Sequence, residues 1–176
     1  VWDRWLSLAF RVLDSSAFYA GIPFSSNEPS YITSLVYNEI DHIKKDHDAV
    51  QILIETKRLT INEPEEKFVT TSIDAAKKSG DFSNLSDEDI STIALSLQLG
   101  AELVTDDFAV SNVAKNLNIK VIPVMTDGIK NVVTWRYYCP GCEFDNYLIS
   151  GASTTHSRIT ECPRCGSKLK RKPMKN

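Results

Sequence analysis

The stretch that decides the fold runs from Asp89 to Phe108 and reads DISTIALSLQLGAELVTDDF. Its first half predicts a helix over Asp87–Leu99, because apolar residues recur every three or four positions on one face: Ile90, Ile93, Ala94 and Leu97. Its second half predicts a buried strand, Leu103–Thr105, that ends in two acids, Asp106 and Asp107. A helix followed by a buried strand is the repeating unit of a parallel α/β sheet.

A second predicted strand, Phe10–Leu13, also ends in an acid, since Asp14 follows it directly and Ser15 is suited to begin a helix. If the two strands are parallel neighbours, Asp14 and one of the two acids after Thr105 converge on the same edge of the sheet. Open α/β folds bind their ligands at this edge. The ligand site is therefore expected there.

Glu39 is predicted to lie on the buried face of an amphipathic helix over Tyr31–Ile43. The apolar residues of that segment recur at helical spacing around it: Ile32, Leu35, Val36, Ile40 and Ile43. Burying an ionised carboxylate costs several kcal/mol unless a cation or good hydrogen bonds compensate it. Lys44 and Lys45 lie off this face. Glu39 is therefore expected to have a partner elsewhere in the fold.

Together with an acid from the start of the Asp87–Leu99 helix, the predicted edge gathers four carboxylates. Two like charges about 4 Å apart repel by roughly 4 kcal/mol at an effective dielectric of about 20. Mg²⁺ or Mn²⁺ removes this repulsion, because both ions prefer carboxylate and water oxygens. Two such ions activate a water against a phosphodiester without any histidine. The pattern thus indicates a divalent-metal pocket suited to phosphodiester hydrolysis.

Each aspartate taken singly has a structural alternative. Asp14 and the Asp106-Asp107 pair are suited to cap the helices that follow them, and Ser86 with Asp89 matches a capping box. Periodicity does not choose between Asp87 and Asp89. Glu39 alone has no such alternative.

All four cysteines lie near the end of the chain, as Cys139-Pro-Gly-Cys142 and Cys162-Pro-Arg-Cys165, with 19 residues between the pairs. Each C-x-x-C turn directs two thiolates toward one ion, so the spacing predicts a structural Zn²⁺ in tetrahedral Cys₄ coordination. Disulfides are the alternative. They need an oxidising compartment, and the sequence shows no secretion signal.

Charge divides between the two parts of the chain. Residues 1–133 carry 12 Lys and Arg against 20 Asp and Glu, a net charge of −8, whereas residues 134–176 carry 8 against 3, a net charge of +5. Because phosphates need cations to approach, a basic tail beside an acidic pocket suits nucleic acid. The expected RNA contacts are the basic residues Arg158, Arg164, Lys168, Lys170, Arg171 and Lys172. Three aromatic residues serve either as stacking surfaces or as a small core: Trp135, Tyr137 and Tyr138.

The chain as a whole is predicted to be of the α/β class, with a central parallel sheet flanked by helices and a small C-terminal zinc ribbon. Predicted strands near 10–14, 59–62, 102–105 and 120–124 alternate with helices near 31–45, 48–58, 68–79, 87–99 and 109–117. The predicted domains are a nuclease-type body over residues 1–128, a short linker over 129–136, and the ribbon with its basic tail over 137–176. A tail of this size needs its metal to fold.

The order Asp14, Glu39, Asp89, Asp107 resembles the acidic residues of PIN-domain nucleases. Three motifs match. The first is a hydrophobic residue followed by Asp14 and Ser15, and the second is Asn38-Glu39 on a helix. The third is the stretch Asp89–Phe108, which has an acid, an Ala/Leu-rich helix, a strand and then Thr-x-Asp. The resemblance implies that these four acids are the catalytic metal ligands. It selects Asp89 over Asp87 and Asp107 over Asp106, and it implies that Thr105 hydrogen-bonds within the site.

A PIN domain followed directly by a Cys₄ zinc ribbon resembles the Nob family of ribosome-maturation endonucleases, in a short, archaeal-type arrangement. The resemblance implies a cytoplasmic endoribonuclease that cuts the small-subunit ribosomal RNA precursor at its mature 3′ end, using Mg²⁺ or Mn²⁺. It also implies that the ribbon docks RNA or pre-ribosomal proteins. A membrane is not expected among the partners. Two alternatives remain open: a toxin-like or general PIN ribonuclease acting on tRNA or mRNA, and a non-catalytic scaffold that binds RNA or a ribosomal protein.

Overall fold

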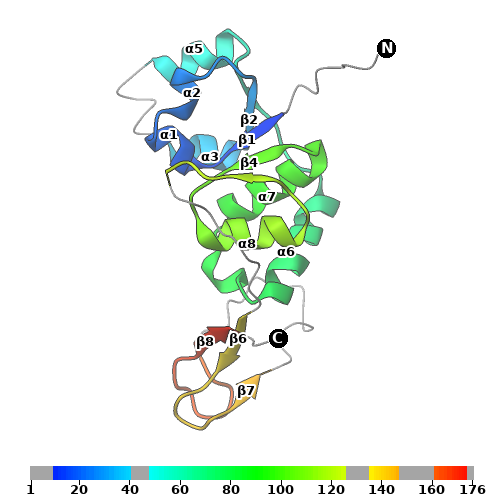
Figure 1. Cartoon of the computed structure of the whole chain (residues 1–176). Coiled ribbons are helices and arrows are strands. Elements are labelled where there is room, and N and C mark those ends of the chain that lie inside the picture. Colours follow the sequence, from blue (N-terminus) through cyan, green and yellow to red (C-terminus); the bar gives the residue numbers. More distant parts are fainter. Residues whose placement is uncertain (1–9, 41–47, 126–134, 147–160, 174–176) are drawn as a thin grey trace.

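The computed structural model describes residues 10–40, 48–125, 135–146 and 161–173, which form an α/β body and a small ribbon of strands (Figure 1). Five short strands of the body pair in parallel in the order β3-β2-β1-β4-β5. They are β1 (Arg11–Leu13), β2 (Ser30–Ile32), β3 (Leu59–Ile61), β4 (Glu102–Val104) and β5 (Val121–Ile122). The predicted central parallel sheet is confirmed.

Helices cover both faces of this sheet. One face carries α6 (Glu66–Ser79), α7 (Asp87–Leu99) and α8 (Phe108–Asn116), with the short 3₁₀ turn η1 (Phe82–Asn84) between the first two. The other face carries α1 (Ser15–Tyr19), α2 (Ile22–Ser25), α3 (Ser34–Glu39) and α5 (Ala49–Glu55). The strands are therefore buried on both sides, as apolar strands of parallel sheets usually are.

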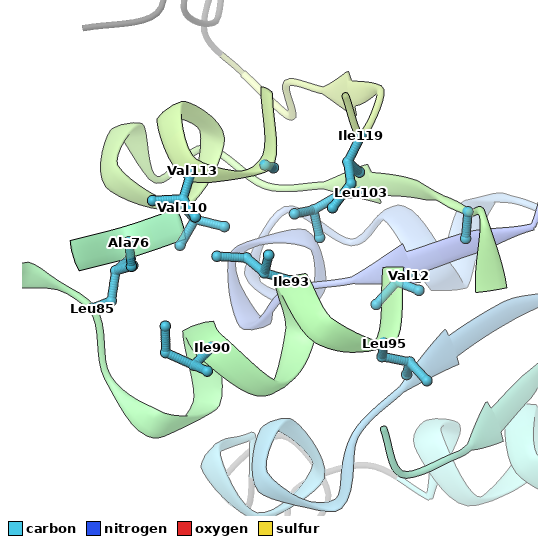
Figure 2. Packing of buried hydrophobic residues seen from close by; sticks show 12 residues of the cluster. Val12, Ala76, Leu85, Ile90, Ile93, Leu95, Leu103, Val110, Val113 and Ile119 are labelled. Carbon is cyan, nitrogen blue, oxygen red and sulfur yellow. The ribbon is translucent and has the colours of Figure 1, made fainter. Parts of the chain in front are cut away.

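The alternation of side chains along each strand divides the core into two clusters. Val12 of β1 and Leu103 of β4 belong to the cluster that includes residues of α6, α7 and α8 (Figure 2), whereas the next residues, Leu13 and Val104, pack on the opposite face. Ile93 of α7 is fully buried in the first cluster. This packing sets β1 and β4 side by side, with their carboxyl ends at one edge.

The helix predicted from residue 31 begins later in the structure. Ser30–Ile32 forms β2, which pairs with both β1 and β3, and Thr33 then caps α3 by accepting a hydrogen bond from the Val36 backbone N–H at 3.3 Å. Ile32 is buried as a strand residue, so its fit to the helical spacing was coincidental. Tertiary pairing of β2 between two strands outweighs the local helical pattern.

The ribbon is a three-stranded antiparallel sheet in the order β7-β6-β8, formed by β6 (Trp135–Tyr138), β7 (Asp145–Asn146) and β8 (Lys170–Pro173). Strand β6 starts two residues inside the segment predicted as a linker. Among the residues described, no helix has both the length and the apolar character needed to cross a membrane.

Candidate functional site

Two of the predicted acids, Asp14 and Asp107, meet at the carboxyl edge of the sheet. β1 and β4 pair in parallel with Leu13 opposite Val104, so the residues that follow them, Asp14 and Thr105, are neighbours. The Thr105 hydroxyl donates to Asp14 Oδ2 at 2.7 Å, and the Asp14 backbone N–H donates to the Val104 carbonyl at 3.1 Å. Thr105 Oγ1 also accepts from the Asp107 backbone N–H at 3.0 Å. A single buried hydroxyl thus joins the ends of both strands.

Asp89 and Asp107 cap helices with one oxygen each, and within the described part of the chain the other oxygen accepts no hydrogen bond. Asp89 Oδ2 accepts from the backbone N–H and the hydroxyl of Ser86 at 2.7 and 2.8 Å, which completes the capping box at the start of α7. Asp107 Oδ1 accepts from the backbone N–H groups of Ala109 and Val110 at 2.7 and 2.9 Å at the start of α8. Helix capping and metal ligation therefore do not exclude each other at these two residues.

The carboxyl group of Asp14 lies in an environment that disfavours its charge. Asp14 is 5% exposed, and this burial raises the pKa of its carboxyl above the usual range, although hydrogen bonds from Thr105 and Ser15 act in the opposite direction. The negative charge of Glu39 raises it further. Burial likewise raises the pKa of Asp89, with smaller contributions from the charges of Asp14 and Asp107. Like-charge repulsion thus links Glu39 to Asp14, and Asp14 and Asp107 to Asp89.

Glu39 is in this group, but not for the reason expected from its spacing. It ends α3 and is exposed, and Leu35 one turn earlier is 37% exposed, so the prediction that Glu39 lies on a buried face is wrong. Only Val36 and Ile40 of the predicted stripe are buried on this helix. Ile43 lies outside the described residues. The electrostatic effect of Glu39 on Asp14, rather than burial, places it beside the acidic edge.

The two alternative acids point elsewhere. Asp106 accepts from the backbone N–H groups of Val124 and Met125 at 2.8 and 2.9 Å, and so fastens the end of β5. Asp87 lines a separate cavity of about 230 Å³ together with Leu35, Val69 and Phe82. Ser16, which was not predicted as a site residue, donates to Asp14 Oδ2 at 3.2 Å and accepts from the Asp106 backbone N–H at 3.3 Å. Its position two residues after Asp14 was the only available signal.

No cation of the described part of the chain forms a salt bridge with Asp14, Glu39, Asp89 or Asp107. Several carboxylates that share a partly buried edge without a protein cation have the donor set that hard divalent ions prefer. Asp89 Oδ1 and Asp107 Oδ2 are the oxygens left over from capping. This edge is the candidate active site.

The four cysteines form a second, more compact site. The Sγ atoms of Cys139, Cys142, Cys162 and Cys165 all lie within 4.8 Å of one another. The closest pairs, Cys139–Cys165 at 3.3 Å and Cys142–Cys162 at 3.6 Å, are far longer than a disulfide bond of about 2.05 Å, and all four cysteines are free. Four thiolates about 2.3 Å from one central ion would lie about 3.8 Å apart. The spacing fits a tetrahedral metal site.

Local hydrogen bonds build the two metal-binding turns in similar ways. The Cys139 backbone N–H donates to the Phe144 carbonyl at 2.9 Å, and the Cys162 backbone N–H donates to the Ser167 carbonyl at 2.8 Å. Hydrogen bonds with the hydroxyl and backbone of Ser167 lower the pKa of Cys165 to about 6. A thiol with this pKa is mostly thiolate at neutral pH, the form that binds metal.

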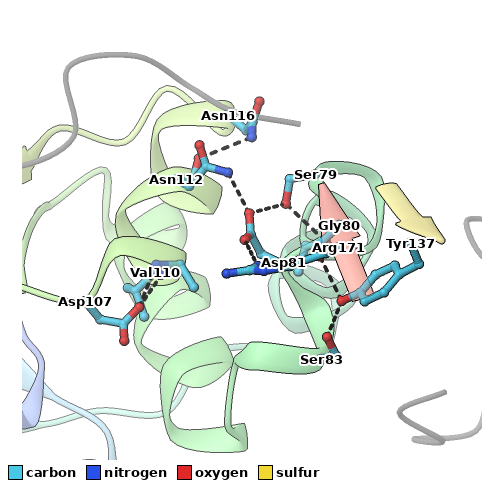
Figure 3. Close-up of polar contacts among 12 residues, drawn as sticks. Ser79, Gly80, Asp81, Ser83, Asp107, Val110, Asn112, Asn116, Tyr137 and Arg171 are labelled. Carbon is cyan, nitrogen blue, oxygen red and sulfur yellow. Dashed lines mark hydrogen bonds and ion pairs between the residues drawn. The ribbon is translucent and has the colours of Figure 1, made fainter. Parts of the chain in front are cut away.

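The register of the ribbon sheet separates the predicted RNA contacts into two groups. Tyr137 lies opposite Arg171, and this pair faces the body: Arg171 Nη1 donates to Asp81 Oδ1 at 2.9 Å, as Figure 3 shows. Lys170 and Lys172 flank Arg171 and therefore point to the other face of the sheet. Arg171, one of the predicted RNA contacts, thus pairs with the body and remains an exposed residue.

The remaining predicted contacts lie on the ribbon or beyond the described residues. The Lys172 ammonium lies 4.7 Å from the ring centre of Tyr138, and the Arg164 guanidinium lies 4.5 Å from that of Phe144. Lys168 and Lys170 are exposed. Arg158 falls outside the described residues, and the same holds for the side chain of Trp135.

Comparison with known proteins agrees with this arrangement. Residues 11–99 match the family model described as "PIN domain of ribonuclease". The chain is 35% identical over 167 residues to Endoribonuclease Nob1 of Methanocaldococcus jannaschii, which covers 94% of this chain and 79% of the relative. It is 33% identical over 164 residues to Endoribonuclease Nob1 of Pyrococcus abyssi, covering 90% of this chain and 91% of the relative.

A third relative, Ribonuclease VapC1 of Thermoplasma acidophilum, is 30% identical over 132 residues, which is 75% of this chain and 63% of that protein. The Nob1 relatives match more of the chain, enough to include residues from both the body and the ribbon. The chain therefore belongs to the Nob1 family of endoribonucleases.

Proposed function

We propose that this chain matures the 3′ end of small-subunit ribosomal RNA by cutting its precursor, and that the ribbon docks the RNA or the pre-ribosomal particle. The observation that carries this proposal is the combination, in one chain, of an acidic PIN edge and a four-cysteine ribbon with a basic face, matched over 94% of the chain by a Nob1 relative. We place this activity in the cytoplasm, where proteins of the particle would be its other partners.

Asp14, Glu39, Asp89 and Asp107 would hold the catalytic Mg²⁺ or Mn²⁺. When bound, such an ion activates water for attack on the phosphodiester and stabilises the leaving oxygen. The chain's own contribution is orientation. Thr105 and Ser15 fix the carboxyl plane of Asp14 through its two oxygens, while Ser86 fixes Asp89 through one. Rigid ligands lower the entropic cost of assembling the reacting groups.

Cys139, Cys142, Cys162 and Cys165 would hold a structural Zn²⁺. With four protein ligands the site is closed, so it has no open position for a substrate water. Among the described residues the ribbon's core is small: Leu169 is buried with Cys139 and Cys162, and Tyr137 and Phe144 pack against them. The ion would therefore supply most of the folding free energy of the ribbon.

The ribbon face that points away from the body is the proposed RNA surface. Strand alternation puts Arg136, Tyr138, Lys170 and Lys172 on this face, because Arg136 pairs with Lys172 and Tyr138 with Lys170. Lys168 and Arg164 add charge at the metal-binding turns, and Arg158 remains part of the proposal. Basic side chains around the half-buried ring of Tyr138 suit a single-stranded backbone with a stacked base.

The test is to incubate the protein with a precursor fragment that spans the mature 3′ end, in Mg²⁺, Mn²⁺ or EDTA, and to map the ends produced. We expect one dominant cut at the mature end that requires a divalent ion and that Asp107→Asn abolishes. Asp106→Asn is the matched control, since its carboxylate fastens β5 and does not face the acidic edge. Cutting that continues in EDTA would refute a metal-dependent site.

The resemblance to Ribonuclease VapC1 favours one alternative, a general PIN ribonuclease acting on tRNA or mRNA. That function needs no ribbon. Replacing Lys170 and Lys172 by glutamine separates the two functions, because weaker binding and a smaller salt dependence are expected only if the ribbon contacts the substrate. A third function, a non-catalytic RNA or ribosome scaffold, predicts no new RNA ends under any condition.

A further inference from the structure

The inner face of the ribbon sheet is built to fit one corner of the body. Tyr137 and Arg171 are directly opposite each other in the β6–β8 register, so their side chains leave the same face of the sheet. Both reach the segment Ser79–Asn84, where α6 ends and η1 begins, as Figure 3 shows. These two side chains and this corner are called the latch below.

The charged half of the latch is centred on Asp81. This carboxylate is 1% exposed and accepts three hydrogen bonds: from Asn112 Nδ2 at 2.6 Å, from Ser79 Oγ at 3.0 Å and from Arg171 Nη1 at 2.9 Å. Asn84 adds its side-chain oxygen, which accepts from Arg171 Nη2 at 2.8 Å in the amide orientation that satisfies both groups. The body supplies two neutral donors to a buried charge, and the ribbon supplies the cation.

The uncharged half of the latch is the Tyr137 hydroxyl. It donates to the Gly80 carbonyl at 3.0 Å and shares a hydrogen bond with the Ser83 hydroxyl. Gly80 caps α6 in the left-handed conformation, with φ at 81°. Tyr137 also packs against the core formed by Cys139, Cys162 and Leu169. The metal-binding turns and the contact with the body therefore share one side chain.

The latch is connected to the acidic edge through α8. Asn112, which holds Asp81, lies five residues after Asp107 on the same helix, about 7.5 Å along its axis. A helix is stiff over this length. The position of the ribbon relative to Asp107 is thus set by direct contacts, and the proposed RNA surface faces away from them.

We propose that Asp81, Arg171 and Tyr137 are positioning residues that hold the zinc ribbon in one orientation on the PIN body, and so set the distance between the RNA-binding face and the bond that is cut. The docking rests on the contacts above. Its role in choosing the bond rests on the proposed function. Arg171 therefore acts through the body and not through RNA.

The docking is tested without RNA by a double-mutant cycle on the zinc-loaded full chain. Arg171→Gln strands a buried carboxylate, whereas Asp81→Asn with Arg171→Gln removes both charges, so the single variant should lose more melting temperature than the double variant. Lys170→Gln, on the opposite face, is the control and should shift the melting temperature little. Equal shifts for Arg171→Gln and Lys170→Gln would overturn the docking.

The relative motion of body and ribbon gives a second readout, which a change in local stability alone would not alter. In ¹⁵N relaxation, body and ribbon of the native chain should share one rotational correlation time. The triple variant Asp81→Asn, Tyr137→Phe, Arg171→Gln should lose this shared time, with the ribbon tumbling faster than the body. Separate times in the native chain, or a shared time in the triple variant, would refute the latch.

Cleavage then tests the consequence. The triple variant should cut a short unstructured RNA as fast as the native chain but cut the precursor fragment at scattered positions. An unchanged single cut would overturn the positioning role. If the native chain fails to cut the precursor at all, the proposed function fails, while the melting and relaxation measurements still decide the docking.

Discussion

Replacing Asp14 by asparagine should abolish RNA cutting and at the same time stabilise the metal-free protein. Asparagine caps helices about as well as aspartate, so the hydrogen bond from the Ser15 backbone N–H at 2.8 Å is kept. The oxygen that accepts from Thr105 becomes an NH₂ group, so the Thr105 hydroxyl must accept from this group instead of donating to it. What disappears is a charge that burial and Glu39 both disfavour.

The expected gain is about 0.5–2 kcal/mol, the usual range for relieving one unfavourable feature. For a chain of 176 residues, each kcal/mol shifts the melting temperature by about 2–4 °C. The matched variant Asp106→Asn should shift it in the opposite direction. Asp106 receives two backbone N–H groups at 2.8 and 2.9 Å, and weakening these charge-assisted bonds costs about 1 kcal/mol.

The effect of Asp14→Asn depends on pH in a defined direction. Because the folded-state pKa of Asp14 is raised above 3.8, its charged form destabilises the native chain at neutral pH, and protonation removes this effect as pH falls through the raised pKa toward 3.8. The stability difference between the native chain and Asp14→Asn should therefore be full at pH 7 and shrink in that acidic window.

The assay is thermal unfolding of both chains in EDTA and in excess Mn²⁺, from pH 4 to pH 7, together with RNA cutting at pH 7. Mn²⁺ should stabilise the native chain by mass action and the variant much less. A variant that is less stable than the native chain in EDTA yet still cuts RNA would show that Asp14 is a helix cap and not a metal ligand.

Three further outcomes follow from the same geometry. Products should carry 5′-phosphate and 3′-hydroxyl ends, because the attack by water does not use the ribose hydroxyl. For the same reason a 2′-deoxy residue at the cut should be tolerated. A 2′,3′-cyclic phosphate found by mass spectrometry would reject the four-carboxylate site. Gly166→Ala should lower the stability of the ribbon by about 1–2 kcal/mol, because Gly166 has φ of 71° although there is open space for a Cβ. The measurement is faster zinc release to a chelator. Gly166→Asn should lower the stability less. Cys139→Ser should unfold the ribbon by circular dichroism and also lower the melting temperature of the body, because Asp81 loses Arg171; a body transition that does not move would contradict this coupling.

Much of the fold was predictable because its signals are local. The helix over Asp87–Leu99, the strand after it and the capping box of Ser86 and Asp89 are all properties of residues within a few positions of one another, and the structure has them as predicted. The strand at Ser30–Ile32 was missed since its hydrogen-bond partners lie elsewhere in the chain. Its own spacing imitates a helix.

The sequence proposed the acids of the candidate active site, but it did not predict their environments. Glu39 stood out as a buried acid, and it is an exposed one beside Asp14, because the helix begins at Ser34 and turns this side chain outward. Asp106 and Asp107 are adjacent in sequence with the same chemistry. Only the positions of β5 and α8 separate a carboxylate that fastens a strand from one that faces the acidic edge.

The sequence by itself determined a parallel α/β body, a four-cysteine metal site and a division of charge between them, since periodicity, spacing and composition act over short stretches of chain. Only the tertiary structure decided which face of the ribbon each basic residue occupies. Arg171 and Lys172 are neighbours in a run of like charges, but strand alternation sends them to opposite faces. The partner of Arg171 is Asp81, 90 residues earlier, and a contact over that separation is chosen by packing and burial and leaves no local pattern.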